Sequence, residues 1–135
     1  TCFTPKVKNI FSEIFIKSIN SLAFNLIALK YEQNNYKLKK NIKAKKEVLK
    51  MLREGDEILK KNEIKIYQSP ISRLNQTLKS TSHTMSMLFA YKTGNKIEIR
   101  ELWKSFDQII KIIHVKMTNT EKNFKFIEKK LYEII

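Results

Sequence analysis

The sequence contains very little glycine, proline and cysteine, and each shortage excludes a class of structure or site. With two glycines and two prolines in 135 residues the chain has few positions for turns, which predicts long helices joined by short loops. Gly55 and Gly94 lie too far apart to form a glycine-rich phosphate loop. The single cysteine, Cys2, excludes an internal disulfide and a cysteine-based zinc site. The composition therefore favours an all-α protein.

Residues that support catalysis or metal binding are also scarce. Neither His83 nor His114 has a second histidine or a carboxylate at metal-ligand spacing, and neither forms the Glu-x-x-His pair of di-iron bundles. No serine lies in a nucleophile elbow, and Cys2 lies so near the terminus that it lacks the ordered surroundings of a nucleophile. We therefore predict a non-catalytic protein without a cofactor or a metal, in which both histidines have structural roles.

The length and apolar content of the chain are those of one domain. A chain of 135 residues with 42% hydrophobic residues is long enough to bury a core and too short to favour two domains. No internal repeat is visible, and no linker rich in glycine, serine or proline divides the sequence. We expect a single helical-bundle domain over residues 1–135, with residues 1–5 frayed.

Apolar periodicity predicts a four-helix bundle. The expected helices cover residues 5–31, 36–61, 70–93 and 96–135. Pro5 and Pro70 suit first helical turns, and Ser69 offers a side-chain cap to the helix that follows it. Gly94 suits a left-handed helix end, whereas Gly55 is expected to soften or kink the second helix.

The second and third helices are each expected to be buried along one apolar stripe. The stripe of the second helix contains Leu38, Ile42, Leu49, Leu52 and Leu59. The stripe of the third helix contains Ile71, Leu74, Leu78, Met85, Leu88 and Phe89. Within the third helix, the small and hydroxylated residues 80–86 would let a neighbouring helix approach closely.

The strongest periodic signal lies in the C-terminal third of the chain, where spacings of four and three alternate. The positions are Ile99, Trp103, Phe106, Ile110, Ile113, Met117, Thr120, Phe124, Ile127, Leu131 and Ile134. The period of 3.5 favours one unbroken helix of about 60 Å with Trp103 in the core. Alternatively, residues 118–121 cap a separate fifth helix. So long a stripe needs a partner, which is either the first helix or a second copy of the chain in a homo-oligomer.

The N-terminal helix has the length of a membrane span over residues 10–29. It also contains four residues that lipid tolerates poorly, Glu13, Lys17, Asn20 and Asn25. We predict that this stretch is the central helix of a bundle and not a transmembrane span. The chain begins with Thr and not with Met, which slightly favours a secreted or surface protein over a cytoplasmic one. Near such an end Cys2 could carry a lipid, although a free thiol is the simpler interpretation.

The chain is strongly basic. Its formal net charge is +14, from 27 basic and 13 acidic residues, and such a charge predicts attraction to polyanions. Only Arg53, Arg73 and Arg100 are arginines, although phosphate-binding proteins commonly use the planar guanidinium group. The alternative is a compositional bias toward Lys, Asn and Ile that leaves the lysines as a solvated face.

The basic residues concentrate in the second predicted helix, on the side opposite its apolar stripe. One line about 16 Å long contains Lys39, Lys43, Lys46 and Lys50. Flanking this line are Lys37, Lys40, Lys45 and Arg53. Only Glu47 lies near the line, and because a row of like charges repels itself, the row favours an acidic partner. The candidate binding residues are Lys39, Lys43, Lys46, Lys50, Arg53, Lys37 and Lys40.

Two functions are consistent with such a bundle. The first is a protein-binding module, secreted or displayed on a surface, that uses exposed helix side chains. The Lys-, Asn- and Ile-rich composition resembles that of helical surface lipoproteins of spirochaetes that bind host proteins, a resemblance that assigns no residue a role. The alternative is a nucleic-acid-binding protein without sequence preference that uses the lysine row. The scarcity of arginine and of exposed aromatic residues counts against this alternative.

Overall fold

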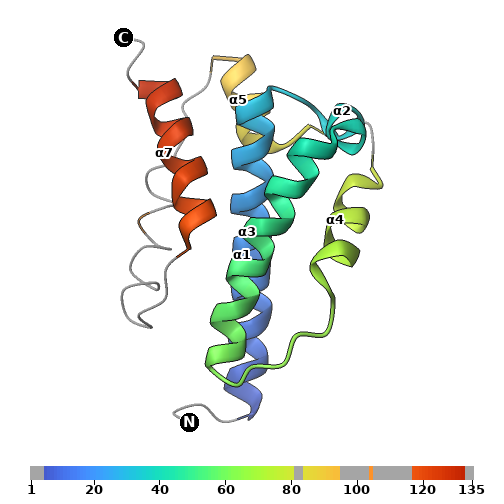
Figure 1. Cartoon of the computed structure of the whole chain (residues 1–135), viewed down its shortest axis with the longest axis vertical. Coiled ribbons are helices and arrows are strands. Elements are labelled where there is room, and N and C mark those ends of the chain that lie inside the picture. The colour runs from blue at the N-terminus through green and yellow to red at the C-terminus, as the bar shows by residue number, and fades with distance from the viewer. Residues whose placement is uncertain (1–4, 81–83, 95–103, 105–116, 133–135) are drawn as a thin grey trace.

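The chain is an all-α bundle, as predicted. The structure, a computed structural model, describes residues 5–80, 84–94, 104 and 117–132, and each secondary-structure element in that part is a helix. The elements are α1 (Pro5–Tyr31), α2 (Asn35–Lys40), α3 (Ile42–Lys61), α4 (Pro70–Leu78), α5 (Ser86–Lys92) and α7 (Thr118–Tyr132). Helix α1 contacts α3, α5 and α7, and α7 and α4 lie on opposite sides of the α1–α3 pair (Figure 1).

Helix α1 is the centre of the bundle and has the predicted bounds, Pro5–Tyr31. Its C-terminal half is buried on nearly every side because α3, α5 and α7 surround it. The chain leaves the helix at Glu32, which has a left-handed φ of 50°, and the Gln33 N–H donates to the Ala28 carbonyl at 3.2 Å. In the N-terminal half, Ile10 and Ile14 are exposed.

One helical stretch in the described part of the chain, Ser12–Tyr31, is long and apolar enough to cross a membrane by length and composition. Its most apolar window is 61% buried inside the bundle. The core helix of a soluble protein passes the same test, so this burial favours the core-helix interpretation. That the chain has no transmembrane span stays a prediction.

The helix predicted over residues 36–61 is broken at Asn41, which the sequence analysis did not foresee. Asn41 has an extended backbone, and its side chain accepts a hydrogen bond from the Ala44 N–H at 3.0 Å, so it is the N-cap of α3. Helices α2 and α3 therefore follow different axes (Figure 1). The break turns Ile42 out to solvent with 67% of its surface exposed, so its predicted burial was wrong. Leu49 is only partly buried, and the other residues of the predicted stripe, Leu38, Leu52 and Leu59, are buried.

Gly55 does not kink the helix, contrary to the prediction. Helix α3 continues through it, and Gly55 lies directly against Ile19 of α1. A Cβ atom at this position would lie 2.9 Å from Cγ1 of Ile19, closer than such atoms approach in real proteins. The glycine therefore serves the α1–α3 contact, which offsets its low helix propensity.

The helix predicted over residues 70–93 is two helices, α4 and α5. Its start is confirmed, since the Ser69 hydroxyl accepts from the Ser72 N–H and Pro70 occupies the first turn. Helix α4 ends at Leu78, where the hydroxylated segment begins, and serine and threonine favour caps and turns over helix interiors. Of the predicted stripe, two residues are exposed against expectation, Ile71 and Phe89, while Leu74, Leu78, Met85 and Leu88 are buried.

Two buried asparagines attach the ends of these short helices to the rest of the bundle. The side-chain amide of Asn35 donates to the carbonyls of Thr77 and Ser80, each at 3.1 Å, at the C-terminal end of α4. The side-chain oxygen of Asn25 accepts from the Met87 N–H at 3.0 Å, in the first turn of α5. Helix α5 is followed by Gly94, whose φ of 76° confirms the predicted left-handed position.

The C-terminal helix is not continuous through Met117, as one unbroken helix would require. Met117 is not helical and α7 begins at Thr118, so the alternative is confirmed as to where the helix begins. The N–H groups of Asn119 and Thr120, however, donate to Glu54 of α3, so the cap comes from outside residues 118–121. In the described part of the predicted stripe, Met117, Thr120, Phe124 and Ile127 are buried as expected, whereas Leu131 is only partly buried. The predictions for Cys2, His83, Trp103 and His114, and for the remaining stripe positions, lie outside the described residues.

Candidate polyanion-binding surface

The seven predicted binding residues are all exposed, and they are called the basic surface below. They are Lys37, Lys39 and Lys40 on α2, and Lys43, Lys46, Lys50 and Arg53 on α3. The break at Asn41 changes their arrangement, since Lys39 does not continue the line of α3. The straight part of the row is therefore the segment from Lys43 to Arg53, about 15 Å long at 1.5 Å per residue.

The acid expected beside this row, Glu47, is turned away from it toward α1. Its carboxylate accepts from Lys30 Nζ and from the Tyr31 hydroxyl, each at 2.5 Å, and Lys30 also donates to Asn123 of α7 at 3.1 Å. Burial by itself would raise the pKa of Glu47, but these hydrogen bonds and the nearby Lys43 outweigh it and hold the pKa below its ordinary value. Burial and the hydrogen bond to Glu47 raise the pKa of Tyr31 to about 12.

Glu54 and Asp56 of α3 are likewise engaged inside the bundle. The Glu54 carboxylate accepts from the backbone N–H groups of Asn119 and Thr120, at 2.7 and 2.8 Å, and so caps the start of α7. Asp56 accepts from Nη2 of Arg73 on α4 at 2.7 Å. Burial raises the pKa of Asp56 in spite of this neighbouring cation.

The charges of α3 are therefore sorted between its two faces. From Ile42 to Arg53 the described outer face carries four cations and no acid, and none of these cations has an ion-pair partner among the described residues. Glu57 is the first exposed acid further along, and it lies 3.8 Å from Lys60. This sorting was not visible in the sequence, because it depends on which side chains α1, α4 and α7 contact.

A shallow depression adjoins the basic surface where α2 meets α3. It has a volume of about 460 Å³ and is lined by Gln33, Lys37, Lys40, Asn41 and Ile42. Beside it, Lys40 Nζ lies 4.1 Å from the centre of the half-exposed Tyr36 ring. An exposed aromatic ring, that of Tyr36, and an exposed apolar side chain, that of Ile42, thus accompany the cations at this end of the surface.

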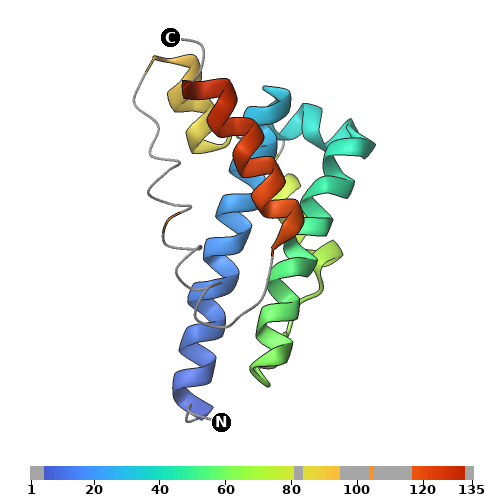
Figure 2. The ribbon, with the colours of Figure 1, turned by 60° about the vertical axis from the view of Figure 1, so that its left-hand side comes forward.

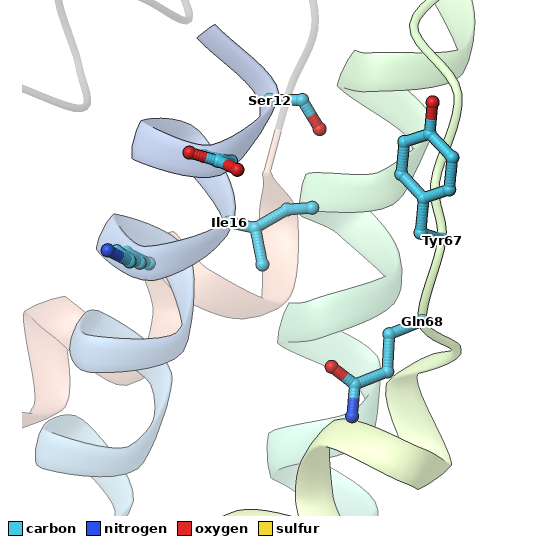
Figure 3. A pocket seen from close by; sticks show the side chains of 6 residues that line it. Ser12, Ile16, Tyr67 and Gln68 are labelled. Carbon is cyan, nitrogen blue, oxygen red and sulfur yellow. The ribbon is translucent and has the colours of Figure 1, made fainter. Parts of the chain in front are cut away.

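A second pocket, which the sequence analysis missed, lies between α1 and the segment that connects α3 to α4. It has a volume of about 580 Å³ and is lined by Ser12, Glu13, Ile16, Lys17, Tyr67 and Gln68. Figure 3 shows Ser12 and Ile16 on α1 facing Tyr67 and Gln68 across the gap. No group of residues suited to a metal ion occurs in the described part of the chain. In the sequence, the pocket is indicated only by Ser12, a small polar residue in an apolar helix.

Comparison of the chain with protein-family models, with curated proteins and with solved structures found no match.

Proposed function

We propose that the protein is a non-catalytic interaction module that binds a negatively charged macromolecule through its basic surface. The sorting of charge on α3 carries this proposal. Glu47, Glu54 and Asp56 are engaged inside the bundle, while the outward cations form no ion pair with a described residue. Lys43 acts on Glu47 only at longer range. Cations held side by side repel each other, so the negative charge of a partner would lower the free energy of this face.

A protein with an acidic patch is the first partner class, of the kind that a secreted or surface-displayed module would meet. The depression between α2 and α3 supports it, because exposed Ile42 lines it together with Lys37 and Lys40, and the exposed Tyr36 ring contacts Lys40. Protein interfaces commonly combine an apolar centre with a charged rim. Nucleic acid, bound without sequence preference, is the second class, supported by the segment from Lys43 to Arg53, where the exposed residues are cations alone.

The proposal is tested with heparin, a sulfated polyanion that stands for neither class in particular. One variant replaces three cations of α3, Lys43→Gln, Lys46→Gln and Lys50→Gln. A matched control removes the same charge from exposed lysines elsewhere, Lys17→Gln, Lys79→Gln and Lys92→Gln. Affinity is measured by isothermal titration calorimetry at 50 and 200 mM salt, and circular dichroism confirms that each variant is folded.

We expect the α3 variant to lose about tenfold or more in affinity at 200 mM salt, which is about 1.4 kcal/mol, while the control stays within about twofold. Equal losses in both variants would show that binding follows net charge alone, and the proposal would then be wrong.

A further inference from the structure

Helix α7 carries exposed lysines of its own that the sequence analysis did not count as binding residues. Lys122 and Lys129 are exposed and have no ion-pair partner in the described part of the chain. Lys125 is also exposed, but it pairs with Glu121 at 3.0 Å. Lys122 and Lys129 are called the α7 pair below, and Lys43 and Lys50 are called the α3 pair.

Both pairs lie on the edges at which α3 and α7 meet. Lys43 and Lys50 precede Glu47 and Glu54 by four residues each, and residues four apart share one edge of a helix. Glu54 contacts the first turn of α7. On α7, Lys122 follows Asn119 by three residues and Lys129 follows Phe126 by three. Asn119 contacts Glu54, and the Phe126 ring lies 5.2 Å from Lys30 Nζ, which binds Glu47.

Two contacts fix the register of the helices. Glu54 meets Asn119, and Met51, one turn earlier on α3, meets Asn123, one turn later on α7. The two helices are therefore antiparallel. Counting back along α3 and forward along α7 from these contacts places Lys50 at the level of Lys122, and Lys43 at the level of Lys129. The two levels agree to within about 3 Å along the axes.

The two pairs also point to the same side of the bundle. Helices α3 and α7 contact each other, and both contact α1, and Figure 2 shows α7 and α3 side by side over part of their lengths. The faces of α3 and α7 that are turned away from α1 are therefore adjacent. The acids of α7, Glu121 and Glu128, fall at helical positions on the edge away from α3. Of the described residues that lie between the two pairs, Phe126 alone is apolar and exposed, with 49% of its surface exposed.

We propose that the α3 pair and the α7 pair form a two-row cationic face that binds the backbone of duplex nucleic acid without sequence preference. This inference depends on the proposed function and selects one partner class for it. A duplex presents two lines of phosphate, and each row faces a different strand. A linear polyanion presents one line of charge, which one row would satisfy. An acidic protein would require a larger apolar centre than the seam offers.

The spacing of the rows suits this partner. Seven residues separate the two lysines of each pair, which is about 10.5 Å along a helix, and three base-pair steps of a duplex cover about 10 Å. Packed helix axes lie about 8–10 Å apart where they touch, which is between the widths of the minor and major grooves, about 6 and 12 Å. Helices α3 and α7 separate from their contact at Glu54 toward the C-terminal end of α7 (Figures 1 and 2), so the two rows diverge along the face. Lysines supply point charges that bind phosphate oxygens and leave the base edges unread.

The test measures the salt dependence of binding by fluorescence anisotropy with a labelled 20-base-pair duplex and with a single strand of the same length. Three double variants remove equal charge. They are Lys43→Gln/Lys50→Gln, Lys122→Gln/Lys129→Gln, and the control Lys17→Gln/Lys79→Gln. Each duplex phosphate neutralised contributes about 0.9 to the slope of log K against log salt. With the duplex, the α3 and α7 variants are each expected to lower this slope by about 1.8, and the control to leave it unchanged.

The other outcomes overturn different statements. If only the α3 variant lowers the slope, the two-row face is wrong and the proposed function stands. If both variants also lower the slope for the single strand, as they do for the duplex, then the partner is a linear polyanion and the assignment of a duplex is wrong. If neither pair differs from the control, the inference is wrong, and the heparin measurement then decides whether the proposed function falls with it.

Discussion

Helix α3 attaches α7 on one side and α4 on the other through acidic side chains, but the two attachments differ. On the α7 side, Glu54 accepts two backbone hydrogen bonds and one from the Thr120 hydroxyl at 3.0 Å. On the α4 side, Asp56 and Arg73 form one buried ion pair at 2.7 Å. Nε and Nη1 of Arg73 have no hydrogen-bond partner within the described part of the chain.

The difference shows when a desolvated charge stabilises a fold. Removing a charged group from water is favourable only if hydrogen bonds replace those that water made. The carboxylate of Glu54 meets donors that the start of a helix leaves free in any case. Arg73 is 2% exposed, and one salt bridge replaces only part of its hydration. The contact of Glu54 with α7 is therefore expected to stabilise the bundle. The buried ion pair with α4 is expected to contribute little to the free energy of unfolding.

The largest expected effect comes from breaking the α4 attachment on one side only. Arg73→Leu leaves the Asp56 carboxyl buried without its cation, which is expected to lower the free energy of unfolding by about 3 kcal/mol. Urea denaturation followed by circular dichroism measures this loss. The double variant Asp56→Leu/Arg73→Leu is expected to recover most of it, because buried pairs replaced by apolar residues are often neutral or stabilising. A double variant as unstable as the single one would show that the pair is well satisfied.

Breaking the contact between Glu54 and α7 is expected to lower the free energy of unfolding by a smaller amount. Glu54→Ala removes the acceptor for two N–H groups of the first turn of α7, and caps of this kind contribute about 1–2 kcal/mol. Hydrogen exchange should locate the effect at the amides of Asn119 and Thr120. Glu57→Ala, at an exposed position one turn from Glu54, is the matched control and should leave both amides protected. Unchanged protection in Glu54→Ala would mean that packing alone fixes the start of α7.

The smallest effect is in the pH dependence of stability, where the two sides of α3 should have opposite signs. The lowered pKa of Glu47 means that its contribution is present above the unfolded pKa of about 4.3 and is lost as pH falls through the folded value. The raised pKa of Asp56 means that stability falls as pH rises from about 3.9 through its folded value. We expect Glu47→Gln to flatten the loss of stability in acid and Asp56→Asn to steepen it, as measured by urea midpoints from pH 3 to 7. The same sign for both variants would contradict this comparison.

Local signals in the sequence predicted the helix ends that depend on neighbouring residues alone. The start of α4 at Ser69 and Pro70 and the left-handed Gly94 are of this kind, because caps and turns follow from the backbone preferences of single residues. The apolar period also placed Thr120 in the buried stripe correctly, since a period survives whether or not the helix before it is broken.

Features that depend on distant contacts were not predictable in this way. Gly55 was expected to disturb α3, and only its contact with Ile19, across 36 positions of sequence, shows why a glycine is needed there. Asn41 is of a residue type that caps helices well, but it lies in a lysine-rich stretch whose apolar period continues through it, so the break was not predicted. The candidate binding residues were predicted as exposed, but the removal of Glu47 from among them depends on Lys30 and Tyr31 of α1.

The capping of α7 by Glu54 also has a consequence for how the chain folds. A helix of 15 residues is marginally stable by itself in water, and the first turn of α7 obtains its acceptor from a residue 65 positions earlier. Formation of α7 and its docking on α3 are thus one event, which must await the closure of a long loop. During synthesis, the carboxylate of Glu54 emerges well before the helix it caps, so α7 is expected to be the last part of the bundle to become ordered.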